Sequence, residues 1–177
     1  MKVKKTAILP TSLVRNYLPA DYSDVYTYKV NSDKEIVPDD VMVNFWVDFP
    51  AWVNALFKLR NFLVKFVGLK SSEGSDVQEV EKCIRTGTPY HLASVPAKCD
   101  NETILLLSDK HLDAYFSVYV EDKDDNKAVS LITLVHFKNR LGRIYFFFVR
   151  PFHGIGVKRL LKRAVDKVIS IPANLKS

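Results

Sequence analysis

Hydrophobic and polar positions alternate along several short segments of the chain, and this pattern predicts strands. Residues 22–30 are rich in tyrosine and valine, and the polar residues Asn31-Ser32-Asp33 end the segment. Residues 112–121 alternate most regularly, as a strand with one buried and one solvated face does. Polar or glycine-containing connections separate the other candidates. These further strands are predicted over residues 90–97, 102–108, 128–138 and 143–150.

The predicted strand 143–150 carries apolar or aromatic side chains at both odd and even positions. A sheet that is apolar on both faces needs to be covered on both. We therefore expect helices to cover one face of the sheet and a partner subunit to cover the other.

Apolar residues spaced three and four apart predict helices in two other regions. Residues 39–67 are predicted to form a helix that Pro50 divides in two, because proline suits a first helical turn. A last helix is predicted to begin at Pro151 and to end before Pro172, with a stripe of apolar residues opposite a face rich in lysine and arginine.

The remaining segments carry turn-forming or polar residues. Residues 70–88 are predicted to form a surface loop with a short element over 77–85, and residues 1–20 an N-terminal extension. A chain of 177 residues that is 47% hydrophobic is long and apolar enough to form one domain with a core of its own.

Composition also bears on the compartment. No apolar run approaches the roughly 20 residues that span a bilayer, and the apolar segment before Pro10 is too short for a signal sequence. The two cysteines, Cys83 and Cys99, match no disulfide framework or metal motif. We therefore expect a cytoplasmic protein with reduced cysteines.

Positive charge is concentrated at the C-terminal end. Residues 136–177 hold ten Lys/Arg and one acidic residue, a net charge of +9, whereas residues 1–135 hold 16 basic and 19 acidic residues, a net charge of −3. Such asymmetry marks either a surface for nucleic acid or anionic membrane, or a helix with a basic solvent face. The second interpretation is favoured, and no nucleic-acid partner is expected, because no aromatic-basic interleaving or groove-reading motif accompanies the charge.

Four groups of residues, in this order, resemble an uncharacterised bacterial family. They are Asp21-Tyr22-Ser23-Asp24; Phe45-Trp46 with Leu59-Arg60-Asn61 and Gly68-Leu69; Asp109-Lys110-His111-Leu112-Asp113; and Thr133-Leu134-Val135-His136 through Asn139, Leu141-Gly142-Arg143, Tyr145 and Pro151-Phe152-His153. The family they resemble is a domain of unknown function in the START-like (SRPBCC, birch-allergen-like) superfamily.

The resemblance implies an α+β helix-grip fold, in which a curved antiparallel sheet wraps around a long C-terminal helix and two helices follow the first strand. It also implies that the protein binds an apolar or amphipathic, lipid-like ligand between sheet and helix. Some members of the superfamily are enzymes, such as aromatic cyclases, and others are carriers or folding helpers, so the fold does not choose between these functions.

Three histidines are candidate binding residues. His111 lies between two aspartates, which suits either a general base or a hydrogen-bonded turn. His136 alternates in phase with Ile132 and Leu134, so it is either a core residue or a cavity residue that orients a ligand. His153 is expected in the first turn of the last helix, where it either fixes that helix to the sheet or forms a polar contact at the pocket mouth.

Arginine and aromatic residues complete the candidate site. Arg143 is suited to bind a ligand carboxylate, or else to pair with an acidic residue across the sheet, and Tyr145 is in phase with it. Trp46 and Trp52 are expected either to line a cavity entrance or to pack the helices against the sheet.

Three functions remain open at this stage. The first is the binding of a small apolar ligand; the second is an enzyme of the cyclase, dehydratase or hydrolase kind; the third is a protein-interaction module or homodimer. No cofactor is expected, because the sequence has no P-loop, dinucleotide fingerprint, nucleophile elbow or HExxH motif. No metal site is expected either, because the four histidines fall on separate predicted elements.

Overall fold

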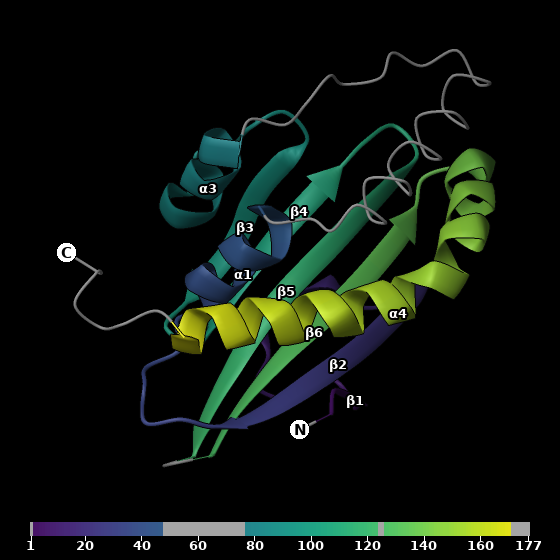
Figure 1. Ribbon diagram of the computed structural model, residues 1–177. Coiled ribbons are helices and arrows are strands. Elements are labelled where there is room, and N and C mark those ends of the chain that lie inside the picture. The colour runs from purple at the N-terminus through teal and green to yellow at the C-terminus, as the bar shows by residue number, and fades with distance from the viewer. Residues whose placement is uncertain (1, 48–76, 124–125, 171–177) are drawn as a thin grey trace.

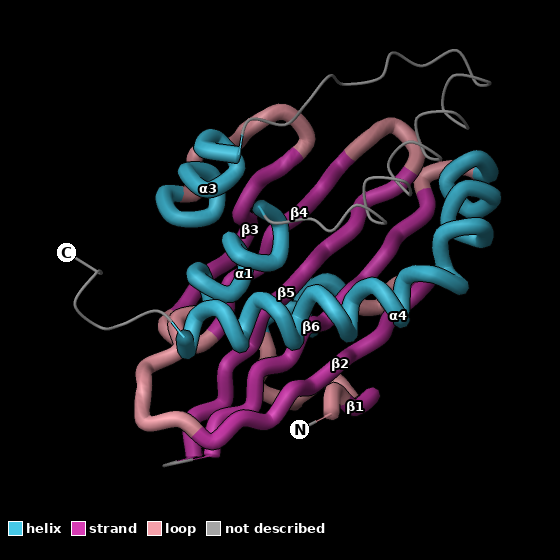
Figure 2. The backbone as a smooth tube through the Cα atoms, in the orientation of Figure 1, coloured by secondary structure: helices cyan, strands magenta, loops and turns pink. Residues whose placement is uncertain are grey.

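A computed structural model describes residues 2–47, 77–123 and 126–170. It forms an antiparallel sheet of six strands in the order β1-β2-β6-β5-β4-β3, with helices across one face (Figures 1 and 2). The elements are β1 (Lys4–Lys5), a 3-10 helix η1 (Leu13–Tyr17), β2 (Tyr22–Asn31), α1 (Pro38–Val47), α3 (Val77–Thr86), β3 (Ala93–Cys99), β4 (Glu102–Ser108), β5 (Leu112–Lys123), β6 (Asn126–Phe137) and α4 (Arg140–Ser170).

Most of the predicted elements are confirmed. Strand β2 and the strands β3 to β6 lie within a few residues of the ranges that alternation predicts, and the short element predicted over 77–85 is helix α3. The first part of the helical region 39–67 is α1. The predicted second helix after Pro50, together with Trp52 and the loop residues 70–76, lies outside the described residues.

The prediction of a strand over 143–150 is wrong, because these residues form the first part of α4. Pro151 does not begin the last helix but lies inside it. The proline ring clashes with the carbonyl of the residue four positions earlier, so a helix bends at such a site. Figure 1 shows the bend between the two parts of α4.

The two faces of the sheet have separate cores. On one face, α1 and α4 pack on side chains such as Tyr28 and Leu131. On the other face, Ile132 and Leu134 pack with residues of the N-terminal segment, including Val14. Over this second core, the chain's own N-terminal residues supply cover of the kind that was expected from a partner subunit.

A buried carboxylate anchors the N-terminal segment to the sheet. Glu102 is fully buried and accepts hydrogen bonds from the hydroxyls of Ser12 (2.7 Å) and Ser117 (2.5 Å). It also accepts the backbone N–H of Leu13 (2.5 Å), at the start of η1. Buried carboxylates are stable when several donors surround them, and Glu102 meets this condition.

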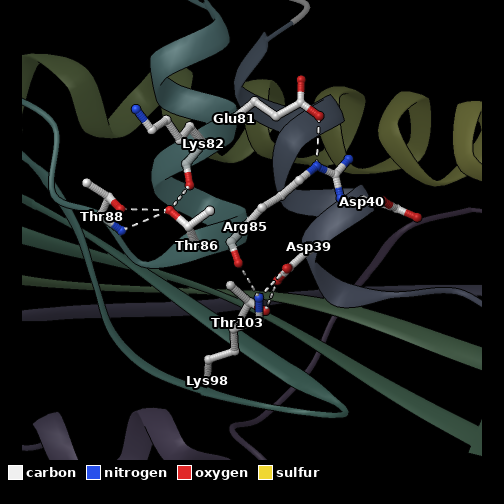
Figure 3. Close-up of polar contacts among 9 residues, drawn as sticks. All are labelled: Asp39, Asp40, Glu81, Lys82, Arg85, Thr86, Thr88, Lys98 and Thr103. Atoms are coloured by element: carbon white, nitrogen blue, oxygen red, sulfur yellow. Dashed lines mark hydrogen bonds and ion pairs between the residues drawn. The ribbon is translucent and has the colours of Figure 1, made fainter.

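A second polar cluster joins α1 and α3 to the sheet (Figure 3). Asp39, in the first turn of α1, accepts a hydrogen bond from the Thr103 hydroxyl of β4 (2.6 Å) and pairs with Lys98 of β3. Arg85 of α3 donates to Asp40 at 3.0 Å and to Glu81 at 2.8 Å. These contacts hold α1 over the sheet, where it forms one wall of the cavity described below.

Replacing Thr103 by valine should lower the free energy of unfolding by about 1–2 kcal/mol, because it removes the hydroxyl that donates to buried Asp39 and keeps the shape of the side chain. Urea unfolding followed by circular dichroism measures this loss. Thr88→Val is the matched control, since the Thr86–Thr88 hydroxyl contact is exposed and its loss should change stability little. Equal effects of the two substitutions would contradict this assignment.

Candidate functional site

A cavity of about 270 Å³ lies between the sheet and α4. Its walls come from β4, β5 and β6 on one side and from α1 and α4 on the other. Most of the side chains that line it are apolar or aromatic; examples are Trp46, Phe116, Val135, Phe146, Phe152 and Leu160.

The sheet side of the cavity is built from residues that share one face of the paired strands β5 and β6. Ala114 lies opposite Val135 and Phe116 opposite Thr133 in the register of β5 and β6, so all four share one face. Ala114 on the sheet contributes only a methyl group to the lining, and Gly156 on α4 has no side chain. Small residues on both walls thus leave space for the cavity.

Three polar side chains lie together at one edge of this mostly apolar lining. Thr133 of β6 and His153 of α4 line the cavity, and Asp24 of β2 lies beside both. Asp24 and Thr133 are direct neighbours across the β2–β6 pair, and His153 Nε2 lies 3.4 Å from Asp24 Oδ2. The hydroxyl of Tyr22 donates a hydrogen bond of 2.6 Å to the same carboxylate oxygen.

The charge state of this cluster follows from its surroundings. Burial raises the pKa of Asp24, but His153, Tyr22 and Thr133 together lower it more, so the pKa lies below its ordinary value. Burial, and then the hydrogen bond to Asp24, raise the pKa of Tyr22 well above its usual range. Asp24 is therefore ionised at neutral pH, and Tyr22 is a neutral donor to it.

The polar cluster has hydrogen-bonding capacity that the described protein does not use. Asp24 Oδ1, Thr133 Oγ1 and His153 Nε2 are buried, and none forms a hydrogen bond of good geometry within the described residues. Nearly all buried polar atoms in proteins are hydrogen-bonded, and exceptions often mark functional sites. A histidine beside a buried carboxylate is also an arrangement that orients an imidazole for hydrogen bonding or proton transfer.

Three of the residues singled out from the sequence line the cavity. They are Trp46, Tyr145 and His153. Trp46 stacks edge-on against Phe116 with 4.8 Å between ring centroids, so it packs α1 on the sheet and lines the cavity at once. His153 lies within α4, about four turns from its start, rather than in its first turn.

His111 belongs to a turn next to the cavity rather than to its lining. Asp109 Oδ1 accepts the backbone N–H groups of His111 (2.6 Å) and Leu112 (2.9 Å), which shapes the entry into β5. The His111 ring lies against the side chain of Asn139, with Nδ1 3.0 Å from Nδ2. Asn139 in turn accepts the N–H of Gly142 at 3.1 Å and caps the start of α4.

His136 and Arg143 also lie away from the cavity lining. His136 faces the opposite side of the sheet, where its ring packs edge-on against Tyr115, 5.6 Å between centroids. The guanidinium of Arg143 lies 5.9 Å from the centroid of the Phe137 ring. The structure thus brings His153 to the cavity and leaves these two residues outside it.

Asp24 and Thr133 are site residues that the sequence analysis did not select. Asp24 is in phase with Tyr22, Tyr26 and Tyr28 on β2, and a carboxylate in the middle of an apolar strand face is a recognisable signal. Thr133 gives no such signal alone, because its importance depends on its pairing with Asp24 across two strands that are distant in sequence.

In the part of the chain that the structure describes, histidine, cysteine and carboxylate side chains form no group of three that could hold a metal ion. Among the described helices, none combines the length and the apolar character needed to span a membrane.

The chain was compared with known proteins. Residues 17–160 match the model of a family described as a protein of unknown function, DUF2867. Neither the curated proteins nor the solved structures give a significant match.

Proposed function

We propose that this chain, which belongs to the DUF2867 family of proteins of unknown function, binds a small molecule. The ligand that we propose has an apolar body and one neutral polar group. The observation that carries the proposal is the set of buried polar atoms of Thr133 and His153, which line a mostly apolar cavity, and of Asp24 directly beside them. Binding sites commonly combine an apolar lining with a few convergent polar groups in this way.

The cavity lining accounts for the apolar body of the ligand. Its volume of about 270 Å³ lies just below the range of roughly 300–1,000 Å³ that is common for ligand pockets. Phe116, Phe146 and Phe152 offer broad apolar contact from both walls. This size fits a single short chain or a small ring system rather than a large lipid.

The polar cluster accounts for the neutral head group. A hydroxyl donates to the Asp24 carboxylate and also accepts from Thr133 or His153, and a carbonyl accepts from the latter two. The pair of ionised Asp24 with His153 has a net charge of zero or −1, depending on the imidazole. A carboxylate head therefore gains no net attraction there and loses its hydration, so alcohols are expected to bind better than fatty acids.

The superfamily assignment is part of the same proposal. A six-stranded antiparallel sheet with a long C-terminal helix across it supports a START-like helix-grip fold. A cavity between sheet and helix is where the resemblance implies that a ligand binds.

The test is a binding experiment with a small neutral fluorescent dye, Prodan, displaced by 1-decanol or by decanoate, which share one apolar chain. Wild-type protein should bind the dye, and decanol should displace it at a concentration at least tenfold lower than decanoate. Native mass spectrometry with organic extraction identifies any molecule that copurifies. Equal displacement by the two competitors would overturn the proposed head group.

Two substitutions, one on each of two opposite walls of the cavity, test whether the dye binds there. Ala114→Phe on the sheet and Val149→Phe on α4 should each weaken dye binding at least tenfold, because both side chains face the cavity. Ile144→Phe is the matched control, since Ile144 is on the same helix but 55% exposed, outside the lining. Dye binding that survives both cavity substitutions in folded protein would exclude this cavity as the site.

A further inference from the structure

The outer side of α4 presents a contiguous set of exposed apolar side chains. This set, called the outer patch here, consists of Leu141, Ile144, Phe147, Phe148, Phe152 and Ile155. Phe147 is 72% exposed, and the other members are between 38% and 56% exposed. Large apolar residues that are exposed singly are normal, but a contiguous group of this kind marks an interaction surface.

The spacing of these residues places them on one helix face. Ile144, Phe148 and Phe152 are four residues apart, and Ile155 is three residues further on, so they follow one another along the helix axis. Pro151 lies on this same face, and its ring opens the helix on that side. The outer patch therefore lies on the side of α4 where Pro151 lies, which is the convex side of a proline bend.

Positive charge surrounds and extends the outer patch. Helix α4 carries eight Lys/Arg and one acidic residue, Asp166, which gives a net charge of +7. Lys158, Arg159 and Lys162 continue along the helix beyond Ile155, and all three are exposed. Two further arginines flank the apolar part and lie over aromatic rings of the sheet, Arg143 over Phe137 and Arg150 over Tyr22.

A helix that combines exposed phenylalanine, leucine and isoleucine with flanking cations has the properties of a helix that lies in a membrane interface. Its apolar side chains enter the lipid boundary while lysine and arginine extend toward anionic head groups. A second copy of the chain is a poorer occupant, because two such helices would bring two net charges of +7 together. A nucleic acid would meet the cations and would find Phe147, Phe148 and Phe152 for stacking, but it is a poorer occupant because the other half of the patch, Leu141, Ile144 and Ile155, is aliphatic and offers no such surface.

We propose that the outer patch and the cations of α4 dock this protein on the surface of an anionic lipid bilayer. The inference goes beyond the proposed function and does not rest on it, since it depends on the outer side of α4 and not on the cavity. One residue joins the two: Phe152 is half exposed in the outer patch and also lines the cavity. Docking by this face would therefore place the cavity beside the lipid.

The experiment is flotation with vesicles of phosphatidylcholine alone and of phosphatidylcholine with phosphatidylserine. Wild-type protein should float with the vesicles that contain phosphatidylserine and only weakly with the others, and high salt should reduce the binding. The double variant Phe147→Ser/Phe148→Ser should lower the partition coefficient at least tenfold. The double variant Lys158→Gln/Arg159→Gln should lower it about tenfold, and only for the anionic vesicles.

Controls separate docking from folding and from the cavity. Val77→Ser changes an exposed apolar residue on α3 and should leave flotation unchanged. Val149→Phe should lose dye binding and keep flotation, so that failure of either proposal is visible without the other. Circular dichroism confirms that each variant is folded.

Several outcomes would overturn the inference. The first is that the wild-type protein does not float with anionic vesicles. The second is that Val77→Ser lowers flotation as much as the Phe147→Ser/Phe148→Ser variant does. The third is that light scattering shows a dimer, which this double variant converts to a monomer without any change in vesicle binding. Binding of a single-stranded oligonucleotide that depends on Phe147 and Phe148, in the absence of vesicle binding, would assign the surface to nucleic acid instead.

Discussion

Replacing Gly142 by alanine should lower the free energy of unfolding by about 3 kcal/mol, although alanine is the better helix former. Gly142 is in the first turn of α4, and a Cβ atom there would lie 2.2 Å from the backbone oxygen of His111 and 2.9 Å from its carbonyl carbon. Both atoms belong to the main chain, so no side-chain rotation relieves the clash.

The expected loss of stability is large because the first turn of α4 meets the turn at His111 at this point. The same His111 oxygen accepts the N–H of Lys138 at 2.8 Å, and Asn139 accepts the N–H of Gly142. Moving α4 away from His111 would strain both contacts and would shift the helix that forms one wall of the cavity. We therefore expect Gly142→Ala to reduce dye binding as well as stability.

Gly154→Ala is the matched control for this prediction. A Cβ at Gly154 would lie 2.6 Å from the hydroxyl of Tyr26, which is the end of a side chain and not main chain, so a small shift relieves the contact more readily than at Gly142. The gain in helix propensity of about 1 kcal/mol offsets part of that adjustment, so stability should change by less than about 1 kcal/mol. Urea unfolding of both variants measures the difference, and equal effects would contradict the proposed backbone clash.

Residues 143–150, which form helix and not the predicted strand, show why an apolar pattern is ambiguous there. Ile144 to Val149 are aromatic or branched throughout, which favours a strand by composition and hides the helical period. In the structure one side of this helix faces the cavity and the other is the outer patch, so both sides are apolar. Pro151 added to the error, because proline is more common at the start of a helix than within one.

The candidate site was predictable only in part, for a related reason. Alternation along β6 places His136 on the opposite face from Thr133, and the structure has the same arrangement. The meeting of Asp24 with His153 could not be predicted, because it needs the register of β2 on β6 and the orientation of α4 over the sheet. Both depend on tertiary packing, and no local pattern encodes them.

Asp24→Asn should lower the free energy of unfolding by about 2–3 kcal/mol at pH 7, the other large effect that we expect. The substitution keeps the shape of the side chain and removes the charge that His153 and the Tyr22 hydroxyl stabilise in a buried site. Because asparagine still accepts a hydrogen bond from Tyr22, the loss stays below that of removing the side chain altogether.

The effect of Asp24→Asn should depend on pH in a direction that the pKa shift determines. The pKa of Asp24 is lower in the folded protein than in the unfolded chain. The charge of Asp24 therefore stabilises the fold fully above the unfolded-state pKa of about 3.9. This stabilisation is lost as the pH falls through the lower folded-state pKa. Urea unfolding at pH 7, 5 and 3 should give a large difference between wild type and variant at the first two values and a smaller one at the third. Asp33→Asn, at an acidic residue in the loop after β2, is the control and should show no comparable loss. A difference that is already gone at pH 5 would mean that burial dominates and that Asp24 is protonated in the folded protein, which would remove the electrostatic argument for a neutral ligand.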